Sequence, residues 1–265
     1  MKSKIISIDG KEKGSIELPA CFSQKIRDDL VSKILEAKKS MQPYSPSLVA
    51  GKQHAAKGKI VHRRHVWRSG YGRGISRVPR KIMSRRGSQF GWVAAEIPFA
   101  RGGMRAHPPK VVAQIKRARI NKKEMKLALM SALSATADAK QMIKRYKSLE
   151  NAKIENLPLI IETKMTLLKT GELISSLKNI LGGQLFNIAL KSKRTRSGKG
   201  GRRGRKYKSN AGALLVVGKG EKMKSNAFDS KNVKDVGITD LANGGMGRLT
   251  IYTEQAMKDL GERFK

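Results

Sequence analysis

The residues of this chain best suited to chemistry are arginines and aromatic rings interleaved along residues 51–110. Residues 62–68 read His-Arg-Arg-His-Val-Trp-Arg, and further arginines surround Tyr71, Phe90 and Trp92. Arginine forks can bind phosphate oxygens in bidentate fashion, and rings or guanidinium planes can stack on unpaired bases. A solvated flexible loop is the alternative, but a loop that stays in water rarely carries two tryptophans. The pattern therefore predicts contact with nucleic acid.

Candidate binding residues come from this stretch and from a second one, residues 191–208. The second stretch holds ten Lys and Arg, no acid and no apolar face. A disordered tail or a nuclear localisation signal would have a similar composition, but segments that look folded flank it on both sides, which favours phosphate clamping. The first stretch supplies Arg63, Arg64, His65, Trp67, Arg68, Tyr71, Arg73, Arg77, Arg80, Lys81, Arg85, Arg86, Trp92, Arg101, Arg105, His107 and Lys110. The second stretch supplies Arg194, Arg196, Lys199, Arg202, Arg203, Arg205 and Lys206.

The glycine-rich motifs do not match those that bind nucleotide cofactors. Around Lys199 the composition resembles a phosphate-binding loop, but the spacing Gly-x4-Gly-Lys-Ser/Thr is absent. The motif Gly-x-Gly-x-Gly that begins at Gly70 follows no expected strand and opens no expected helix, so a dinucleotide fingerprint is rejected. We expect no cofactor.

Residue types for metal binding or catalysis are present but poorly grouped. His62 and His65 could share a metal ion, yet no cysteine or carboxylate cluster accompanies them within the loop, as a four-ligand zinc site would require. A nuclease usually needs several acids to hold Mg²⁺ against phosphate. The basic stretches offer only Glu96, Glu124 and Asp138. We therefore expect neither an enzyme nor a bound metal.

Positive charge is concentrated in part of the chain. Residues 51–149 hold 25 Lys and Arg against three acids, and together with residues 191–208 they carry +32 of the formal net charge of +37. The remaining 148 residues carry only +5 and resemble an ordinary soluble domain. Because neutralised phosphates release counterions and strengthen binding, folded nucleic acid is the expected partner. A free RNA chaperone or RNA-processing factor is the alternative, and a DNA-compacting protein is disfavoured because no recognition helix or zipper heptads are visible.

Cysteine use and hydropathy point to the cytoplasm. Cys21 is the single cysteine, so no intrachain disulfide can form. The first residues lack the apolar run of a signal peptide, and no apolar stretch approaches the ~20 residues of a membrane helix. The basic stretches also lack the amphipathic face of an interfacial anchor. We expect no membrane partner and no homo-oligomer.

The elements that must position the basic residues indicate one α/β body with an internal loop. Short apolar segments alternate with helical ones, which favours a single three-layer domain with a mostly parallel central sheet flanked by helices. Residues 1–50 and 111–265 would form this body, and the basic loop 191–208 would belong to it. Residues 51–110 show no lasting period of 3.6 or 2.0 residues, so we expect a long irregular loop extension that leaves the body and returns.

Hydrophobic spacing and capping residues place the individual elements. Asn121 with Glu124 three positions later resembles a capping box, Thr170 and Thr253 are possible N-caps, and Gly182 with the next glycine should end a helix. Strands are expected at 4–8, 15–18, 157–161, 213–217, 233–238 and 249–252. Helices are expected from residue 23 to before residue 43 and over 121–147, 170–181, 184–190, 225–230 and 253–263.

Four stretches of the chain resemble the universal large-subunit ribosomal protein number four, in its archaeal and eukaryotic branch. They are 40–51; 67–80 (WRSGYGRGISRVPR); 101–110 (RGGMRAHPPK) with 121–124 and 127–137; and 196–217 with 247–254 (GRLTIYTE). Their joint occurrence in this order is highly specific and covers essentially the whole chain. The absence of a long basic extension after Lys265 makes the chain most similar to archaeal members.

The resemblance implies a structural constituent of the large ribosomal subunit. Such a protein binds large-subunit (23S-type) rRNA through basic extensions and supports early subunit assembly. Its loop tip lines the polypeptide exit tunnel, beside ribosomal protein number twenty-two and near the nascent peptide. Carried onto this chain, the tip would lie near residues 77–92. The tunnel-facing residues would be Arg80, Lys81, Arg85, Arg86 and Gln89.

Overall fold

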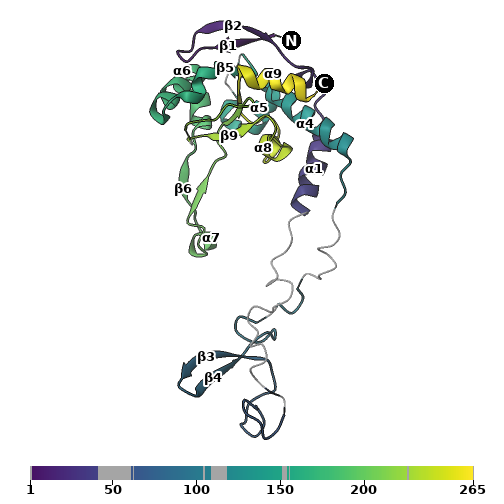
Figure 1. Cartoon of the computed structure of the whole chain (residues 1–265), viewed down its shortest axis with the longest axis vertical. Helices are drawn as coiled ribbons and strands as arrows, with labels where there is room; N and C mark the ends of the chain where they lie inside the picture. The colour runs from purple at the N-terminus through teal and green to yellow at the C-terminus, as the bar shows by residue number, and fades with distance from the viewer. Residues whose placement is uncertain are drawn as a thin grey trace. The chain divides into compact units, whose positions relative to one another are not determined.

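The computed structural model describes residues 2–40, 61, 63–103, 105–108, 118–150, 154, 156–225 and 227–264. Its contacts divide the chain into two compact units, residues 1–36 with 120–265 and residues 37–119. Figure 1 labels the elements of both units. The expected boundaries of the basic loop, at residues 50/51 and 110/111, lie outside the described residues.

The larger unit is built on a six-stranded sheet. Its strands are β1 (Lys2–Ile6), β2 (Glu12–Glu17), β5 (Leu159–Ile161), β8 (Leu214–Val217), β9 (Asp229–Asn232) and β10 (Thr250–Thr253). The strand order is β2-β1-β5-β10-β8-β9, and every neighbouring pair is parallel except β1 with β2. The expectation of a mostly parallel central sheet is confirmed.

Helices cover both faces of this sheet. They are α1 (Asp28–Ser40), α4 (Lys122–Thr136), α5 (Ala139–Arg145), α6 (Thr170–Ala189), α8 (Ile238–Ala242) and α9 (Glu254–Arg263), with 3-10 turns η1 (Ala20–Phe22), η3 (Lys147–Leu149) and η4 (Thr163–Leu167). Successive strand side chains point to opposite faces. Ile160 therefore packs in a cluster with residues of α1, α4, α8 and α9, whereas Leu159 and Ile161 pack with residues of α5 and α6. This arrangement is the three-layer architecture that the sequence predicts.

The fully buried Tyr252 joins β10 to the helical layer that contains α4. Its hydroxyl lies 2.9 Å from Thr136 Oγ1 in α4 and accepts a hydrogen bond from Thr250 Oγ1 at 3.2 Å. Its ring meets the edge of Phe22 at 5.5 Å between centroids. Burial raises the pKa of Tyr252 to about 12 because the phenolate would have to form away from water.

Several helix starts differ from the sequence expectation. α1 begins at Asp28 rather than near Ser23. The single helix expected over 121–147 is two, because the Asp138 side chain accepts from Lys140 N and starts α5. Asn121 precedes α4 without a side-chain cap bond, and Glu124 instead forms an ion pair with Lys33 at 3.0 Å. The capping-box prediction is therefore wrong.

The region between β8 and β10 was also predicted incorrectly. The helix expected over 225–230 and the strand expected over 233–238 are replaced by β9 and α8. Val233 and Val236 are buried, but they lie within a turn in which Asn232 O accepts from Asp235 N and Val236 N. A short run of buried valines resembles a strand even where a turn buries it.

Two of the other three predictions about helix ends are confirmed and one is wrong. Thr253 caps α9 by accepting from Ala256 N, as expected. Thr170 does not cap α6; Glu172 accepts from Lys169 N instead. The expected break at Gly182 is present, because this residue has φ 67° and interrupts α6.

The smaller unit contains a hairpin that the sequence did not reveal. β3 (Arg80–Arg86) and β4 (Gln89–Ala94) pair antiparallel around the turn at Gly87, where φ is 56°. The expectation of a loop without regular structure is wrong for these residues. Most of β3 is exposed, so no apolar alternation marks it, although the turn followed by Phe90 and Trp92 was an available signal.

Candidate nucleic-acid interface

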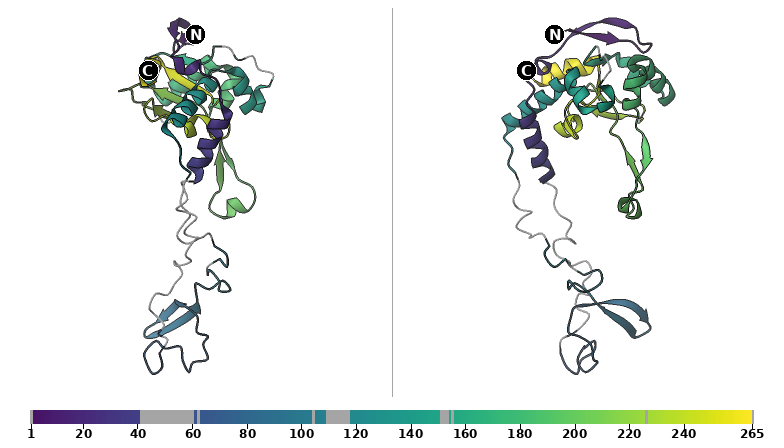
Figure 2. Two further views of the ribbon diagram at one scale, coloured as in Figure 1. Left: turned by 90° about the vertical axis from the view of Figure 1, so that its right-hand side faces the viewer. Right: turned by 180° about the vertical axis from the view of Figure 1, so that it is seen from behind.

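The second basic stretch forms a projecting hairpin rather than an unstructured loop. β6 (Lys193–Thr195) and β7 (Tyr207–Ser209) pair antiparallel, and the short α7 (Lys199–Arg202) lies at the tip. Figure 2 shows this hairpin extending from the sheet of the larger unit. All seven candidate residues of this stretch are exposed: Arg194, Arg196, Lys199, Arg202, Arg203, Arg205 and Lys206. We name residues 191–212 the basic hairpin.

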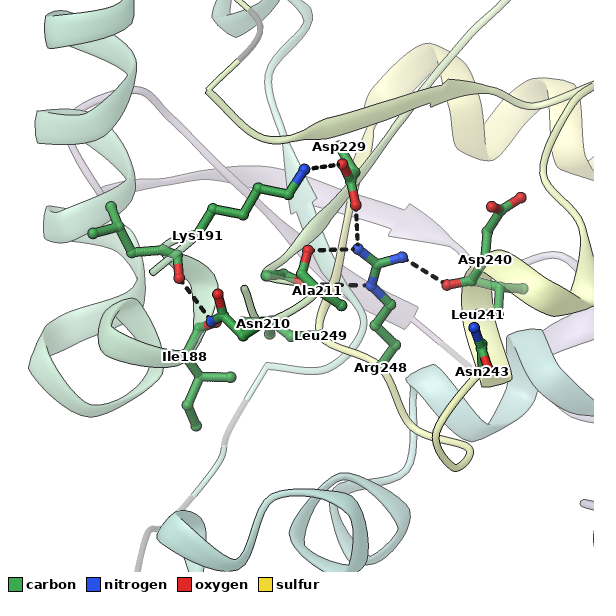
Figure 3. A network of polar contacts seen from close by, with 12 residues as sticks. Ile188, Lys191, Asn210, Ala211, Asp229, Asp240, Leu241, Asn243, Arg248 and Leu249 are labelled. Carbon is green, nitrogen blue, oxygen red and sulfur yellow. Dashed lines mark hydrogen bonds and ion pairs between the residues drawn. The ribbon is translucent and has the colours of Figure 1, made fainter. Parts of the chain in front are cut away.

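A buried arginine outside the predicted site anchors the C-terminal root of the basic hairpin (Figure 3). Arg248, which is 6% exposed, donates to the carbonyl oxygens of Ala211 at 3.0 Å, Gly212 at 3.2 Å and Asp240 at 2.8 Å. It also donates to Asp229 Oδ2 at 2.8 Å. The hairpin root is thereby tied to both β9 and α8.

The N-terminal root is tied to the same carboxylate. Lys191 Nζ donates to Asp229 Oδ1 at 2.6 Å. The Asn210 side chain accepts from Ser192 N at 2.7 Å and donates to the Leu190 carbonyl at 2.8 Å, joining the two roots directly. Burial alone would raise the pKa of Asp229, but hydrogen bonds from Lys191 and Arg248 outweigh it, so the pKa lies below its usual value.

None of these anchoring residues was predicted from the sequence as functional. Arg248 offered one signal, a lone cation beside the apolar run of β10. Asn210 offered another, because it lies two positions after Lys208, the last lysine of the basic stretch. Asp229 gave no local signal, since its partners lie 19 and 38 residues away along the chain.

In the smaller unit the structure gathers rings and guanidinium groups on the β3–β4 hairpin. Phe90 and Trp92 lie on one face of β4 with their ring centroids 5.8 Å apart. The guanidinium of Arg85 lies 5.4 Å from the Phe90 ring centroid. Adjacent rings with a cation beside them are a suitable surface for stacking unpaired bases.

A second group of cations and rings lies in residues 61–77. Arg68 lies over the Trp67 ring at 4.0 Å, and Trp67 is 68% exposed. Arg64 and Arg77 both lie over Tyr71, at 5.6 and 4.7 Å. The structure thus pairs most of the predicted aromatic residues with predicted arginines.

Other described candidates of the first stretch are not paired with a ring. Arg101, Arg105 and His107 are exposed. Arg80 donates to both the carbonyl and the hydroxyl of Ser76, at 2.9 and 2.8 Å. Lys110 and His62 lie outside the described residues.

The candidate cations are not neutralised by the protein itself. Within the described ranges, none of them has a carboxylate oxygen within ion-pair distance; the ion pairs found there use cations of the larger unit and, in the basic hairpin, Lys191 at its root. Glu96 is the only acid among residues 51–110. In the described parts of both basic segments, Lys191 apart, the positive charge is therefore uncompensated.

Among the described residues, no group of three or more His, Cys, Asp or Glu side chains is arranged to hold a metal ion. No helix in that part of the chain has the length and apolar character needed to cross a membrane.

Comparison with known proteins defines the class to which this architecture belongs. A family model described as "Ribosomal protein L4/L1 family" matches residues 16–263. The relatives include proteins named "Large ribosomal subunit protein uL4" from Nanoarchaeum equitans, 36% identical over 99% of this chain and 98% of that protein, and Methanocaldococcus jannaschii, 36% identical over the full length of both. A third, from Archaeoglobus fulgidus, is 34% identical over 99% of each.

The chain is accordingly a ribosomal protein of the large subunit, a structural component of the cytoplasmic ribosome and not an enzyme. Within that class it belongs to the ribosomal protein L4/L1 family. Its similarity to archaeal relatives extends over nearly the whole chain.

Proposed function

We propose that this protein binds large-subunit rRNA through two basic segments, residues 51–110 and the basic hairpin, and so supports early subunit assembly. The observation that carries the proposal is the uncompensated charge of these segments, which contrasts with the ion-paired surface of the larger unit. Exposed cations without carboxylate partners repel one another until phosphates approach them. RNA phosphates would supply the missing counter-charge.

The contacts of the candidate side chains support RNA in particular. Guanidinium groups beside exposed rings suit single-stranded loops and bulges, whose bases can be stacked and splayed out. Arg68 on Trp67 and Arg85 beside Phe90 provide such surfaces. The exposed arginines of the basic hairpin suit the sugar-phosphate backbone.

The tip of the β3–β4 hairpin is the part of the chain that we place at the polypeptide exit tunnel. Its turn projects the exposed Arg85, Arg86 and Gln89, and Arg80 and Lys81 lie at the start of β3. In this proposal the turn lies beside ribosomal protein number twenty-two and near the nascent peptide.

Ultraviolet crosslinking of purified large subunits, followed by mass spectrometry of this chain, tests the RNA contacts. We expect nucleotide adducts on peptides from residues 61–108 and 192–209. We expect few on β2 (Glu12–Glu17) or α9 (Glu254–Arg263), which serve as internal controls. Adducts found only in the larger unit, and there only outside residues 191–212, would overturn the proposal.

The same subunits test the tunnel assignment separately. Cys21 is the only native cysteine and is fully buried, so one engineered thiol reports its own surroundings. The variant Gln89→Cys should crosslink to a stalled nascent peptide, whereas Ser197→Cys on the basic hairpin should not. If both variants crosslink equally, or if Gln89→Cys does not crosslink, the tunnel assignment of the tip is wrong. The proposed rRNA binding would be unaffected by either result.

A further inference from the structure

A hollow of about 460 Å³ lies where the basic hairpin meets the body of the larger unit. Its lining comes from the end of α5, the last turns of α6 and both strands of the hairpin root. It includes Arg145, Tyr146, Asn187, Ser192, Arg194 and Lys208. Its volume falls within the roughly 300–1,000 Å³ of small-molecule sites, so one nucleotide would fit.

Three of the lining residues are cationic, Arg145, Arg194 and Lys208, and none carries a carboxylate. Of the residues with described positions, none pairs a carboxylate with Arg145, Arg194 or Lys208. The Arg145 guanidinium donates to the carbonyl oxygens of Leu241, Asn243 and Gly245, which bind its N–H groups but leave its charge uncompensated. Burial lowers the pKa of Arg145 because it removes the charged guanidinium from water. A bound anion would stabilise that charge.

Two of the lining cations face each other across the hairpin. Arg194 and Lys208 are directly opposite in the β6–β7 register, so their side chains project from the same face. Like charges at directly opposed positions destabilise an antiparallel pair. An anion held between them converts this repulsion into binding energy, and a phosphate group has the required charge and acceptor oxygens.

The rest of the lining suits a nucleobase rather than a bare anion. Tyr146 is half-buried and offers ring surface, and Asn187 and Ser192 offer hydrogen-bonding groups. The walls are fixed before binding, because Asn210 clamps Ser192 and Leu190 while Arg248 and Asp229 anchor the roots. A pre-organised wall reduces the conformational cost of binding.

We infer that this hollow is a subsite for a single nucleotide everted from an rRNA helix, with its phosphate between Arg194 and Lys208 and its base in the hollow beside Tyr146. The inference rests on the proposed rRNA binding and adds a recognition step to it. A bulged nucleotide is the preferred ligand because it is already unpaired and costs least to evert. A free nucleotide shares this chemistry and forms a separate arm of the test.

The test compares a continuous RNA stem with the same stem carrying one bulged adenosine, using the full-length chain. The chain should bind the bulged stem about tenfold more tightly. The double variant Arg194→Gln with Lys208→Gln should lose that preference, and its binding to the continuous stem should weaken only to the extent seen in the control below. The matched control, Arg202→Gln with Arg203→Gln at the hairpin tip, removes the same charge and should weaken binding to both RNAs while keeping the tenfold ratio.

Each outcome is decisive. Equal affinity of the wild-type chain for both stems, or loss of the preference in the tip control, would overturn the nucleotide subsite and leave rRNA binding standing. Failure of the chain to bind either stem would instead remove the proposed function. Adenosine 5′-monophosphate distinguishes a nucleotide of RNA from a free nucleotide as the ligand. If it competes at millimolar concentration with the bulged stem but not with the continuous stem, the subsite is supported. If it binds tightly and the chain shows no preference for the bulged stem, an RNA ligand is contradicted.

Discussion

Asp229 is the residue on which attachment of the basic hairpin depends most. One of its oxygens accepts from Lys191 and the other from Arg248. Because Arg248 is buried, loss of the carboxylate charge would leave a buried cation with only neutral partners. A single side chain therefore connects the stability of the body to the orientation of its RNA-binding element.

The variant Asp229→Asn should lower the free energy of unfolding at pH 7 by about 1–3 kcal/mol. The pKa of Asp229 is lower in the folded protein than in the unfolded chain, so its contribution is present above the usual carboxyl pKa and is lost as the pH falls through the folded value. Urea unfolding of wild type and variant should therefore converge below about pH 4.

Asp9→Asn, at an exposed position, is the matched control and should change stability little at any of these pH values. A difference between wild type and Asp229→Asn that stays constant down to the acid limit would show that ionisation of this carboxyl is not what stabilises the hairpin root.

At the residue scale the sequence predicted well those roles that local spacing defines. The Thr253 cap lies three positions before its partner amide. Arg248 and Asp229 could not be found in this way, because their function exists only after β9, β10 and the hairpin roots have come together. Asn121 shows the opposite error: the local pattern was present, but Lys33 competes for Glu124 in the folded chain.

At the scale of elements, buried strands were predicted more reliably than exposed ones. β8 and β10 are buried along their whole length. The continuous apolar run of β8 and the β-branched and aromatic residues of β10 are typical of buried strands. β6 and β7 are exposed at every residue. Neither face of that hairpin meets a core, so no hydrophobic period exists to reveal it.

The kink in α6 provides a prediction about an element. Gly182 has φ 67° and ψ 175°, a conformation essentially restricted to glycine, and open space around its Cα, so the variant Gly182→Ala should cost about 1–3 kcal/mol through backbone strain alone. Gly171, in the first turn of the same helix, also faces open space and has no positive φ. Gly171→Ala should therefore stabilise the protein by about 0.4–1 kcal/mol. Thermal unfolding of both variants checks the pair, and shifts in the same direction would contradict the assignment of the kink.

At the scale of the whole molecule, the sequence separates charge from core. The two apolar clusters lie on opposite faces of the six-stranded sheet, and no described residue of 51–110 or 191–208, which together carry +24 of the charge, belongs to either cluster. Composition predicted this separation only in part, since the range 51–149 that holds most of the charge also includes the core helix α4. Composition could not predict that both segments contain antiparallel hairpins, because hairpin register depends on turn geometry.

The same separation supports the proposal that residues 1–50 and 111–265 form a body that folds without residues 51–110. The larger compact unit contains the complete six-stranded sheet and both apolar clusters. The basic segments would then serve binding and not folding.

The salt dependence of binding to a large-subunit rRNA fragment tests the central claim most directly, with the full chain and a variant lacking residues 60–105 measured side by side. For the full chain, the slope of log affinity against log salt concentration should be steeper than about −4, as expected for many phosphate contacts. The shortened chain should keep the circular dichroism of a folded α/β protein and show a clearly shallower slope. A full-chain slope shallower than about −4, or one that the deletion leaves unchanged, would contradict the claim.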